Sequence, residues 1–257
     1  MKTVAVIPTY NGERTITQVV KETKKYCDEV IVVDDCSLDN TPKIIQRLGV
    51  KYALCGKNHG QGSATRIGMR MALEFGADII VTLDSDGQHN PNEIPQVLKP
   101  ILEGRADLAI GSRFMPRIVE AKRREDYLFD ASYAQSTYYF EKREYEASLG
   151  EIPRYRKFGI DIINWLYNVC NSKKLIDTQS CFRAYTRRLV EKLTIKEDGF
   201  GFSTETLIKA RKMGARMVEI PVSCIYHKLK QDSTMNPLKH GLMVAWKTLW
   251  WRIKLWD

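Results

Sequence analysis

The chain has 257 residues, of which 44% are hydrophobic and 28% charged, and its formal net charge is +9. This length allows one large α/β domain or two small ones, and no apolar run approaches the roughly 18 residues that a membrane-spanning helix needs. The positive charge favours an anionic partner, such as nucleotide phosphates, anionic lipid or nucleic acid.

Residues 1–114 alternate predicted strands with predicted helices. Apolar runs predict buried strands at 3–10, 29–35, 50–55, 78–84 and 106–114. Apolar residues at helical spacing predict helices at 12–27, 40–49, 62–76 and 92–104. This alternation, with short connections, predicts an α/β fold in which a mostly parallel sheet is covered by helices on both faces.

Charged side chains gather where these strands end. Those at or just past a strand end are Asp34, Asp35, Asp84, Asp86 and Arg113. Ligands bind beyond the carboxyl ends of the strands in open α/β sheets. We therefore expect the functional site at this edge.

The alternation breaks at residues 116–153, which are dense in charge and tyrosine. We predict a helical insertion there. One interpretation is a solvated surface element, and the other is a mobile element beside the site that holds an acceptor or a partner chain. Regular structure resumes with an apolar helix at 158–171 and ends in a strand pair around 216–227.

We find no internal repeat and no linker, so a single domain at 1–236 is the simplest interpretation, with a C-terminal helix at 237–257. The first strand reaches Pro8 and a turn too early for a signal peptide. The six cysteines are scattered without a Cys-x-x-Cys pair. This favours reduced thiols in the cytosol over disulfides or a zinc site.

Two familiar phosphate-binding patterns are absent. The first strand is followed by "PTYNGE" instead of G-x-G-x-x-G, and "GKNHGQGSATR" does not supply a P-loop. The glycine-rich turn of Gly56, Gly60 and Gly62 does follow a strand and open a helix, so its amides can face phosphate or ribose. A merely flexible turn explains the glycines nearly as well.

The acidic pair in "VTLDSDGQHNP" is a stronger signal. Asp84 and Asp86 stand two residues apart at a strand end. Like charges at close range destabilise each other unless a cation lies between them. Mg²⁺ and Mn²⁺ prefer oxygen ligands and share them with substrate phosphates. The alternative is a turn that caps the helix beginning near Pro91.

Five motifs in order resemble glycosyltransferase family 2, which has the GT-A fold and uses nucleotide sugars. They are "VIPTYNGE", "VIVVDDCSLDNT", "GQGSATRIG", "VTLDSDGQHNP" and "IGSRF". Downstream, "DTQSCFRAYTRRLVEKL", "GFGFSTETLIKARKMGARMVEIPVSCIYH" and "STMNPLKHGL" resemble the subgroup of dolichyl- or polyprenyl-phosphate hexosyltransferases. The resemblance covers nearly the whole chain except 116–153.

The resemblance implies a donor site. Residues matching its nucleoside and donor pocket are Pro8, Tyr10, Asn11, Glu13, Asp35, Gly62, Arg66, Asp84 and Ser85. Tyr10 would stack on the base, and Asp35 would accept a hydrogen bond from a ring N–H of uracil or guanine. Asp84 would contact the ribose or the donor sugar. Asp86 would hold Mg²⁺ or Mn²⁺ on the diphosphate of a UDP- or GDP-hexose.

The resemblance also implies catalytic and acceptor residues. Arg113 would meet a phosphate with its guanidinium. Gln179, Ser180 and Arg183 occupy the acceptor-side motif. Glu205 matches an acidic position near the acceptor, where it would be a general base for a hydroxyl. A phosphate acceptor is already ionised and needs no base, so Glu205 would then only orient it.

Three positions depart from the subgroup's pattern. Gln61 stands where lysine is common, and Cys181 stands where glycine is frequent and would narrow the acceptor pocket. The insertion after Met115 is longer than expected. His227 is a further candidate for a metal ligand, although a structural role is favoured for a lone histidine.

The C-terminal segment predicts an amphipathic helix with Asn236 as N-cap and Pro237 in its first turn. One predicted stripe holds Leu238, Leu242, Ala245, Leu249 and Trp256, and the other holds Lys239, Met243, Lys247, Trp250 and Lys254. Tryptophans interleaved with cations suit an anionic membrane interface. The alternative is a helix packed on the domain with its tryptophans buried. Both interpretations are compatible if one face of the helix packs on the domain and the other meets the membrane.

Together these observations predict an inverting, metal-dependent hexosyltransferase. Its acceptor would be a polyprenyl or dolichyl phosphate, and it would act as a peripheral protein at the cytoplasmic membrane face. One alternative keeps the chemistry but uses a glycan or small-molecule hydroxyl as acceptor. Another is a non-catalytic basic lipid- or nucleic-acid-binding module. The ordered acidic motifs oppose this, and we expect no nucleic-acid partner.

Overall fold

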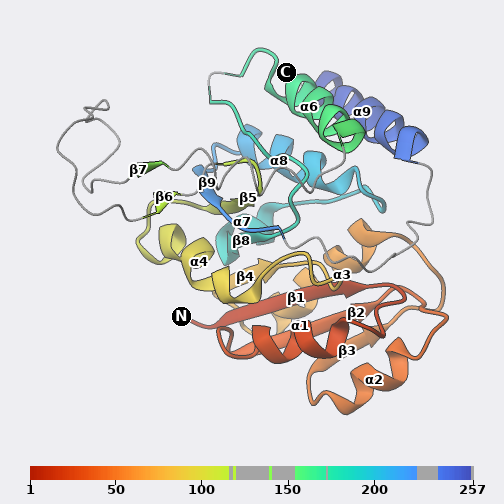
Figure 1. The fold of residues 1–257 in the computed structure, drawn as a ribbon. Coiled ribbons are helices and arrows are strands. Elements are labelled where there is room, and N and C mark those ends of the chain that lie inside the picture. The colour runs from red at the N-terminus through yellow and green to blue at the C-terminus, as the bar shows by residue number, and fades with distance from the viewer. Residues whose placement is uncertain (116–117, 120–138, 141–153, 172, 225–236, 256–257) are drawn as a thin grey trace.

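The computed structural model (Figure 1) describes the chain except residues 116–117, 120–138, 141–153, 172, 225–236 and 256–257. Its main sheet has seven strands in the order β3-β2-β1-β4-β8-β5-β9. The strands are β1 Thr3–Thr9, β2 Glu29–Asp34, β3 Lys51–Leu54, β4 Ile79–Thr82, β5 Leu108–Ser112, β8 Arg183–Thr186 and β9 Met217–Pro221. β8 pairs antiparallel with β4 and β5, and the other pairings are parallel.

Helices cover both faces of this sheet (Figure 1). The helices are α1 Ile16–Thr23, α2 Thr41–Arg47, α3 Gln61–Glu74, η1 Pro91–Glu93, α4 Ile94–Leu102, α6 Arg154–Asn168, α7 Arg187–Lys192, α8 Phe202–Lys212 and α9 Pro237–Lys254. In β1, Val4 and Val6 pack into the cluster formed with α3, α7 and α8, whereas Ala5 and Ile7 pack into the cluster formed with α1, α2 and α4. All four side chains are fully buried. The continuous apolar run therefore serves two cores, one on each side.

The predicted mostly parallel α/β sheet with flanking helices is confirmed. The antiparallel insertion of β8 between β4 and β5 was not predicted. Of the predicted strand pair around 216–227, the structure describes residues up to 224, which hold the strand β9 and an isolated bridge between Cys224 and His89.

Little of the predicted helical insertion can be compared. Within 116–153 the structure describes only β6 Ile118–Val119 and β7 Tyr139–Phe140, which pair antiparallel as a two-stranded sheet. These four residues are strands and not the predicted helix. The rest of the insertion lies outside the described residues, as does His227.

The C-terminal helix α9 packs against α6 and α8. Its buried side is made by Val244, Thr248 and Trp251. This side coincides with neither predicted stripe, because Leu242 of the first is 73% exposed and Trp250 of the second is half-exposed. Among the described residues, no helix is long and apolar enough to span a membrane.

Candidate active site

The carboxyl ends of β1, β2, β4 and β5 bring several predicted site residues to one edge of the sheet. Asp84 lies just past β4, and its Oδ1 accepts a hydrogen bond from Nε2 of Gln61 at the start of α3. The Gln61 amide also lies 3.4 Å from Sγ of Cys181. The Asp84 backbone N–H donates to Nδ1 of His89 at 3.3 Å.

The pKa values of Asp84 and His89 in this cluster are shifted far from those of the free side chains. Burial, and after it the charge of Asp86, raises the pKa of Asp84 to about 7, while the charge of Arg113 acts in the opposite direction. Burial lowers the pKa of His89 to about 3, so this side chain is neutral at physiological pH. The side chain of Asp84 is 26% exposed, and a carboxylate held this close to a second carboxylate is stabilised by a cation.

The donor set fits a hard divalent cation. Asp86 follows the strand by four residues, and its Oδ1 accepts the Gln88 backbone N–H at 2.9 Å. Carboxylate oxygens suit Mg²⁺ or Mn²⁺, which bind proteins through one or two carboxylates and take other ligands from substrate phosphates and water. The described residues contain no group of three or more His, Cys, Asp and Glu placed to hold a metal alone. An ion here would therefore need the substrate to complete its coordination.

Arg113, just past β5, is fixed by a buried fork. Its Nε donates to Oδ2 of Asp177 at 2.8 Å and its terminal nitrogen to Oδ1 at 2.9 Å, while its backbone N–H also reaches Oδ2 at 3.0 Å. Asp177 is fully buried, and Arg113 is 13% exposed. Burial raises the pKa of Asp177, but Arg113 outweighs this and holds it below its ordinary value. The guanidinium is thus held in one orientation beside Asp84.

The segment carrying Asp177 is itself anchored from two elements. Glu219 of β9 accepts the backbone N–H groups of Ile176 and Asp177 at 2.8 Å. Asn164 of α6 accepts from the Thr178 backbone N–H at 3.1 Å and from its hydroxyl at 2.7 Å. These bonds tie the acceptor-side motif to the sheet and to α6.

Two of the three predicted acceptor residues are buried within this anchor. Ser180 is 1% exposed and its hydroxyl accepts the Phe182 backbone N–H at 3.3 Å. Arg183, also 1% exposed, donates to the carbonyls of Ser203 at 3.1 Å and Thr178 at 2.9 Å. These contacts give both side chains a structural role in this conformation. Gln179 donates to the Thr178 hydroxyl at 3.2 Å.

Asp35, past the end of β2, holds the glycine-rich turn. Its two oxygens accept the backbone N–H groups of His59 at 2.9 Å and Gly60 at 2.6 Å. Asp35 is 3% exposed. The carboxylate predicted to bind a base is therefore also the contact that fixes the start of α3.

The predicted nucleoside pocket after β1 lies where the loop after β1 contacts the loop after β2. Tyr10 is 40% exposed, as a ring available for stacking would be. Asn11 has a positive φ of 52° and its side-chain oxygen accepts the Leu38 N–H at 2.8 Å. Glu13 accepts the Asn40 N–H at 3.1 Å. Pro8 belongs to buried β1, and Ser85, next to Asp84, is buried.

Gly62 and Arg66 contact the loop of residues 194–201. A Cβ on Gly62 would clash with the Glu197 carbonyl oxygen, so only glycine lets this loop approach. Arg66 pairs with Asp198 at 2.6 Å. Both predicted donor residues thus support a loop that covers the glycine-rich turn.

Glu205 holds the same loop from the other side. Its carboxylate is fully buried and accepts the backbone N–H groups of Lys196 at 2.9 Å and Glu197 at 2.8 Å. Lys209, one turn along α8, pairs with it as well. With these donors in place, Glu205 acts in this conformation as a loop anchor.

The sequence-based site omitted Asp177 and assigned no role to Gln61 or His89. Asp177 was detectable in part, because it opens the quoted motif "DTQSCFRAY". His89 lies in "VTLDSDGQHNP" but is five residues from Asp84, and nothing in the spacing shows that its ring folds back. Gln61 stood out only as a replacement for lysine.

Comparisons with known proteins agree with this architecture. A crystal structure of glucosyl-3-phosphoglycerate synthase from Mycobacterium tuberculosis, in complex with Mn²⁺, UDP and glucosyl-3-phosphoglycerate, aligns with a TM-score of 0.62 at 17% identity. The alignment covers 99% of this chain and 79% of that one. The shared feature is the fold, and it is that of GT-A glycosyltransferases.

Sequence relatives narrow the class. A UDP-N-acetylglucosamine–dolichyl-phosphate N-acetylglucosaminyltransferase of Methanococcus voltae is 28% identical, covering 86% of this chain and 84% of the relative. An undecaprenyl-phosphate mannosyltransferase of Micrococcus luteus is 26% identical, covering 99% of this chain and 100% of the relative. The model of glycosyl transferase family 2 matches residues 4–193. The chain belongs to this family and is a glycosyltransferase, which confirms the resemblance found in its motifs.

Proposed function

We propose that this protein is an inverting transferase that moves a hexose from a nucleoside diphosphate sugar to a polyprenyl or dolichyl phosphate. The observation that carries the proposal is the pair Asp84 and Asp86 at the end of β4, beside the fixed guanidinium of Arg113. This edge offers carboxylates for a divalent cation and a guanidinium for a phosphate oxygen.

The donor side rests on residues of the first strands. Tyr10, Asn11 and Glu13 would surround the nucleoside of a UDP- or GDP-hexose, and Asp35 would accept from its base. Asp84, with Ser85 beside it, would contact the ribose or sugar. Asp86 would hold Mg²⁺ or Mn²⁺, which supplies charge neutralisation for the departing diphosphate.

The acceptor side favours an ionised group. A hydroxyl acceptor needs a base, but the carboxylate of Glu205 is buried and accepts three donors. A phosphate monoester needs no base, and Arg113 is positioned to bind one. The relatives named for dolichyl and undecaprenyl phosphate point the same way. Gln179 is the acceptor-motif residue that we expect to reach the lipid phosphate.

A lipid acceptor implies a membrane, and we propose that the protein works as a peripheral protein at its cytoplasmic face. The net charge of +9 suits an anionic surface. Exposed tryptophans on α9 suit the interface between water and lipid.

A transfer assay tests the proposal directly. Purified protein is given UDP- and GDP-hexoses, Mn²⁺, and either dolichyl phosphate, undecaprenyl phosphate or a soluble sugar acceptor. We expect hexosyl lipid phosphate as product, with inverted anomeric configuration by NMR, and loss of product with chelator. Transfer to the soluble hydroxyl but not to lipid phosphate would instead support the alternative acceptor.

A further inference from the structure

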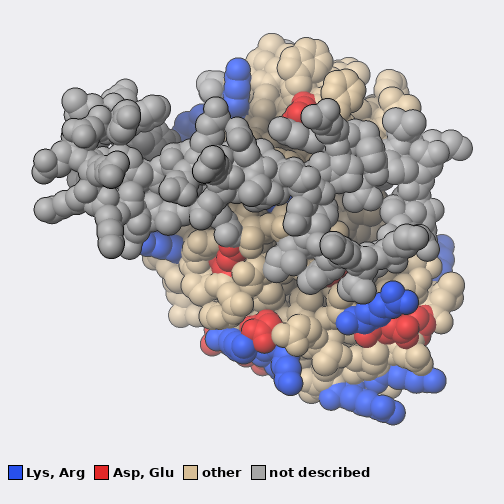
Figure 2. Space-filling model, in the orientation of Figure 1, with Lys and Arg blue, Asp and Glu red and all other residues tan. Residues whose placement is uncertain are grey.

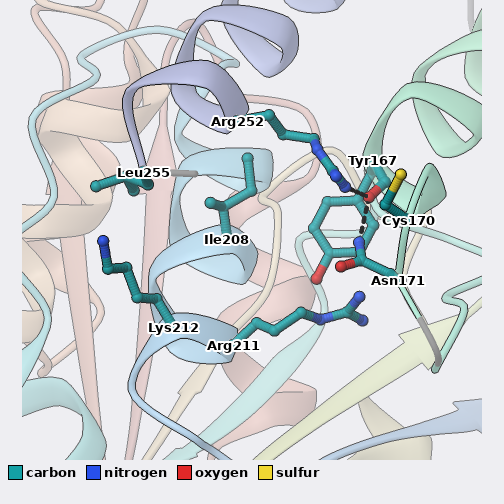
Figure 3. Close-up of a pocket in the computed structure, with 8 residues that line it drawn as sticks. All are labelled: Tyr167, Cys170, Asn171, Ile208, Arg211, Lys212, Arg252 and Leu255. Atoms are coloured by element: carbon teal, nitrogen blue, oxygen red, sulfur yellow. Dashed lines mark hydrogen bonds between the residues drawn. The ribbon is translucent and has the colours of Figure 1, made fainter. Parts of the chain in front are cut away.

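A cavity of about 270 Å³ is lined by residues of α6, α8 and α9 and of the turn after α6 (Figure 3). It is open to solvent at the C-terminal ends of α6, α8 and α9. Its lining is Tyr167, Cys170, Asn171, Ile208, Arg211, Lys212, Arg252 and Leu255. Three of these side chains are cationic and none is a carboxylate.

The cations are held in place by helix ends. Arg211 lies over the Tyr167 ring at 4.8 Å and donates to the Lys173 carbonyl at 2.7 Å. Arg252 donates to the Tyr167 carbonyl. Burial is the main cause that lowers the pKa of Arg252, while Cys170 and Tyr167 act against it and Arg211 adds a smaller lowering. Two positioned guanidiniums and an ammonium lining one cavity without a carboxylate suit a phosphate.

Two of the three helices that line the cavity, α6 and α9, also carry exposed apolar side chains. On α6, Phe158 and Trp165 are 67% and 66% exposed. On α9, Leu242, Trp246 and Ile253 are 73%, 64% and 67% exposed. The two helices pack side by side at the top of Figure 1, where Figure 2 shows a largely uncharged surface. We call these five side chains the α6–α9 apolar face. Exposed aromatic residues gathered on neighbouring helices mark an interaction surface.

We propose that the cavity between α6, α8 and α9 binds the phosphate headgroup of an anionic phospholipid while the α6–α9 apolar face lies in the membrane interface. Charge decides for this occupant, because a cationic cavity on helices that also expose tryptophans matches a phosphate above an acyl layer. The inference rests on the proposed function only in naming its membrane partner, and its test needs no sugar transfer.

The cavity is separate from the reaction centre. At the N-terminal end of α8, Ser203 Oγ lies 3.7 Å from Sγ of Cys181, which contacts Gln61 beside Asp84. At the C-terminal end, Lys212 lines the cavity. The helix between them is about 15 Å long at 1.5 Å per residue. The lipid held there is therefore a docking lipid, distinct from the acceptor.

Vesicle sedimentation tests the charge part. The variant Arg211→Gln/Lys212→Gln should bind phosphatidic acid vesicles about tenfold or more weakly than the parent, because each cation near an anionic surface adds appreciable attraction. The matched control is Lys43→Gln/Lys99→Gln, which removes the same charge from exposed positions on α2 and α4. An equal loss in both variants would overturn the cavity as a specific site.

The apolar part has its own variant. Phe158→Ser/Trp165→Ser changes side chains that are two-thirds exposed, and it should weaken binding to anionic vesicles without lowering the melting temperature. If the double variant Arg211→Gln/Lys212→Gln fails to fold, the single variant Lys212→Glu replaces it in the vesicle assay and should also bind more weakly, since this side chain is exposed. Inorganic phosphate in solution should not displace the protein from vesicles at equal ionic strength. Displacement would indicate a free-phosphate site.

Two further results would overturn the proposal. Equal binding to neutral phosphatidylcholine vesicles and to phosphatidic acid vesicles would show that the cavity does not recognise an anionic headgroup. If the protein forms dimers that Trp165→Ser dissociates, the α6–α9 apolar face is instead an interface between two copies of the chain. Nucleotide affinity by calorimetry should be unchanged in all variants. Vesicle binding can thus fail while donor binding succeeds, so the two proposals fail separately.

Discussion

Strand β5 is bracketed by two Arg–Asp pairs of nearly the same geometry. At its carboxyl end, Arg113 reaches Asp177 with Nε and a terminal nitrogen at 2.8 and 2.9 Å. At its amino end, Arg216 reaches Asp107 with the same two groups at 3.0 Å each. In both pairs the arginine's backbone N–H also donates to the carboxylate. The chain thus uses one local arrangement twice.

Environment separates the two pairs. Arg113 and Asp177 are 13% and 0% exposed, whereas Arg216 and Asp107 are 57% and 25% exposed. Water screens the outer pair, which makes it worth little. The inner pair is desolvated, so neither charge tolerates the loss of its partner. The same bonds therefore join the starts of β5 and β9 at one end and fix the guanidinium of the candidate site at the other.

The largest expected effect separates the two ends by activity. Asp86→Ala at the site end should lower hexosyl transfer by more than about 100-fold, the upper end of what losing an outer-shell partner costs a metal site. It should also remove the metal-dependent part of nucleotide binding. Asp107→Ala, at the other end, is the control and should keep transfer. Full activity of Asp86→Ala in chelator-washed buffer would end the metal assignment.

The second prediction separates the two ends by stability. Asp177→Ala leaves a buried guanidinium without its carboxylate and should lower the free energy of unfolding by about 3–5 kcal/mol. Asp107→Ala should cost about 0–1 kcal/mol. Urea denaturation measures both. Similar losses in the two variants would show that the pairs are energetically alike despite their burial.

The sequence predicted the amino-terminal part of the sheet well. β1 and β2 are apolar runs, and a parallel partner of each (β2 for β1, β3 for β2) follows after one helix, so local periodicity contains the information. β8 is different. Residues 183–186 carry a buried arginine and pair antiparallel with strands about a hundred and about seventy-five residues away. No local pattern encodes such a pairing, and β8 was missed as a sheet strand.

The candidate site shows the same division. Motif order located Asp84, Asp86 and Arg113 at one edge, because parallel strands all end there. It did not show which way side chains turn. Arg183 and Glu205 were predicted to face an acceptor, yet each bonds to backbone inside the protein. A motif gives a residue's place in the chain, whereas burial depends on elements packed around it.

The third prediction concerns Asp35, a site-end carboxylate that bonds backbone instead of arginine. Asp35→Ala should weaken nucleoside diphosphate binding by about 1.5–3 kcal/mol, the range for a hydrogen bond to a charged group. It should also loosen the turn, because the N–H groups of His59 and Gly60 lose their acceptor. Calorimetry measures the affinity and hydrogen exchange the turn. Unchanged affinity would place the base elsewhere.

The smallest effect is a difference in pH dependence between the two ends of β5. His89 packs at the site end, its ring 5.4 Å from Phe182. Its pKa is about 3 in the folded state, against 6.5 for the free side chain. Between these values the unfolded chain binds the extra proton, so stability falls as the pH falls below 6.5.

At the other end, hydrogen bonds from Arg216 lower the pKa of Asp107 from 3.8. The stability that this pair contributes is present above pH 3.8 and is lost only as the pH falls further. Acidification below pH 6.5 therefore weakens the site end through His89, whereas Asp84 at the same end, whose pKa is raised from 3.8 to about 7, adds stability as the pH falls from 7 towards 3.8. At pH 5.5, one pH unit below the pKa of this side chain in the unfolded chain, His89 alone should lower the free energy of unfolding by about 1.4 kcal/mol.

The substitution His89→Gln removes this titrating group, so as the pH falls from 6.5 to 4 the variant should lose less stability, or gain more, than the parent. His59→Gln replaces an exposed histidine and is the matched control. Urea midpoints across this range give the measurement. If parent and His89→Gln show the same pH dependence across this range, the pKa of His89 is not lowered in the folded protein.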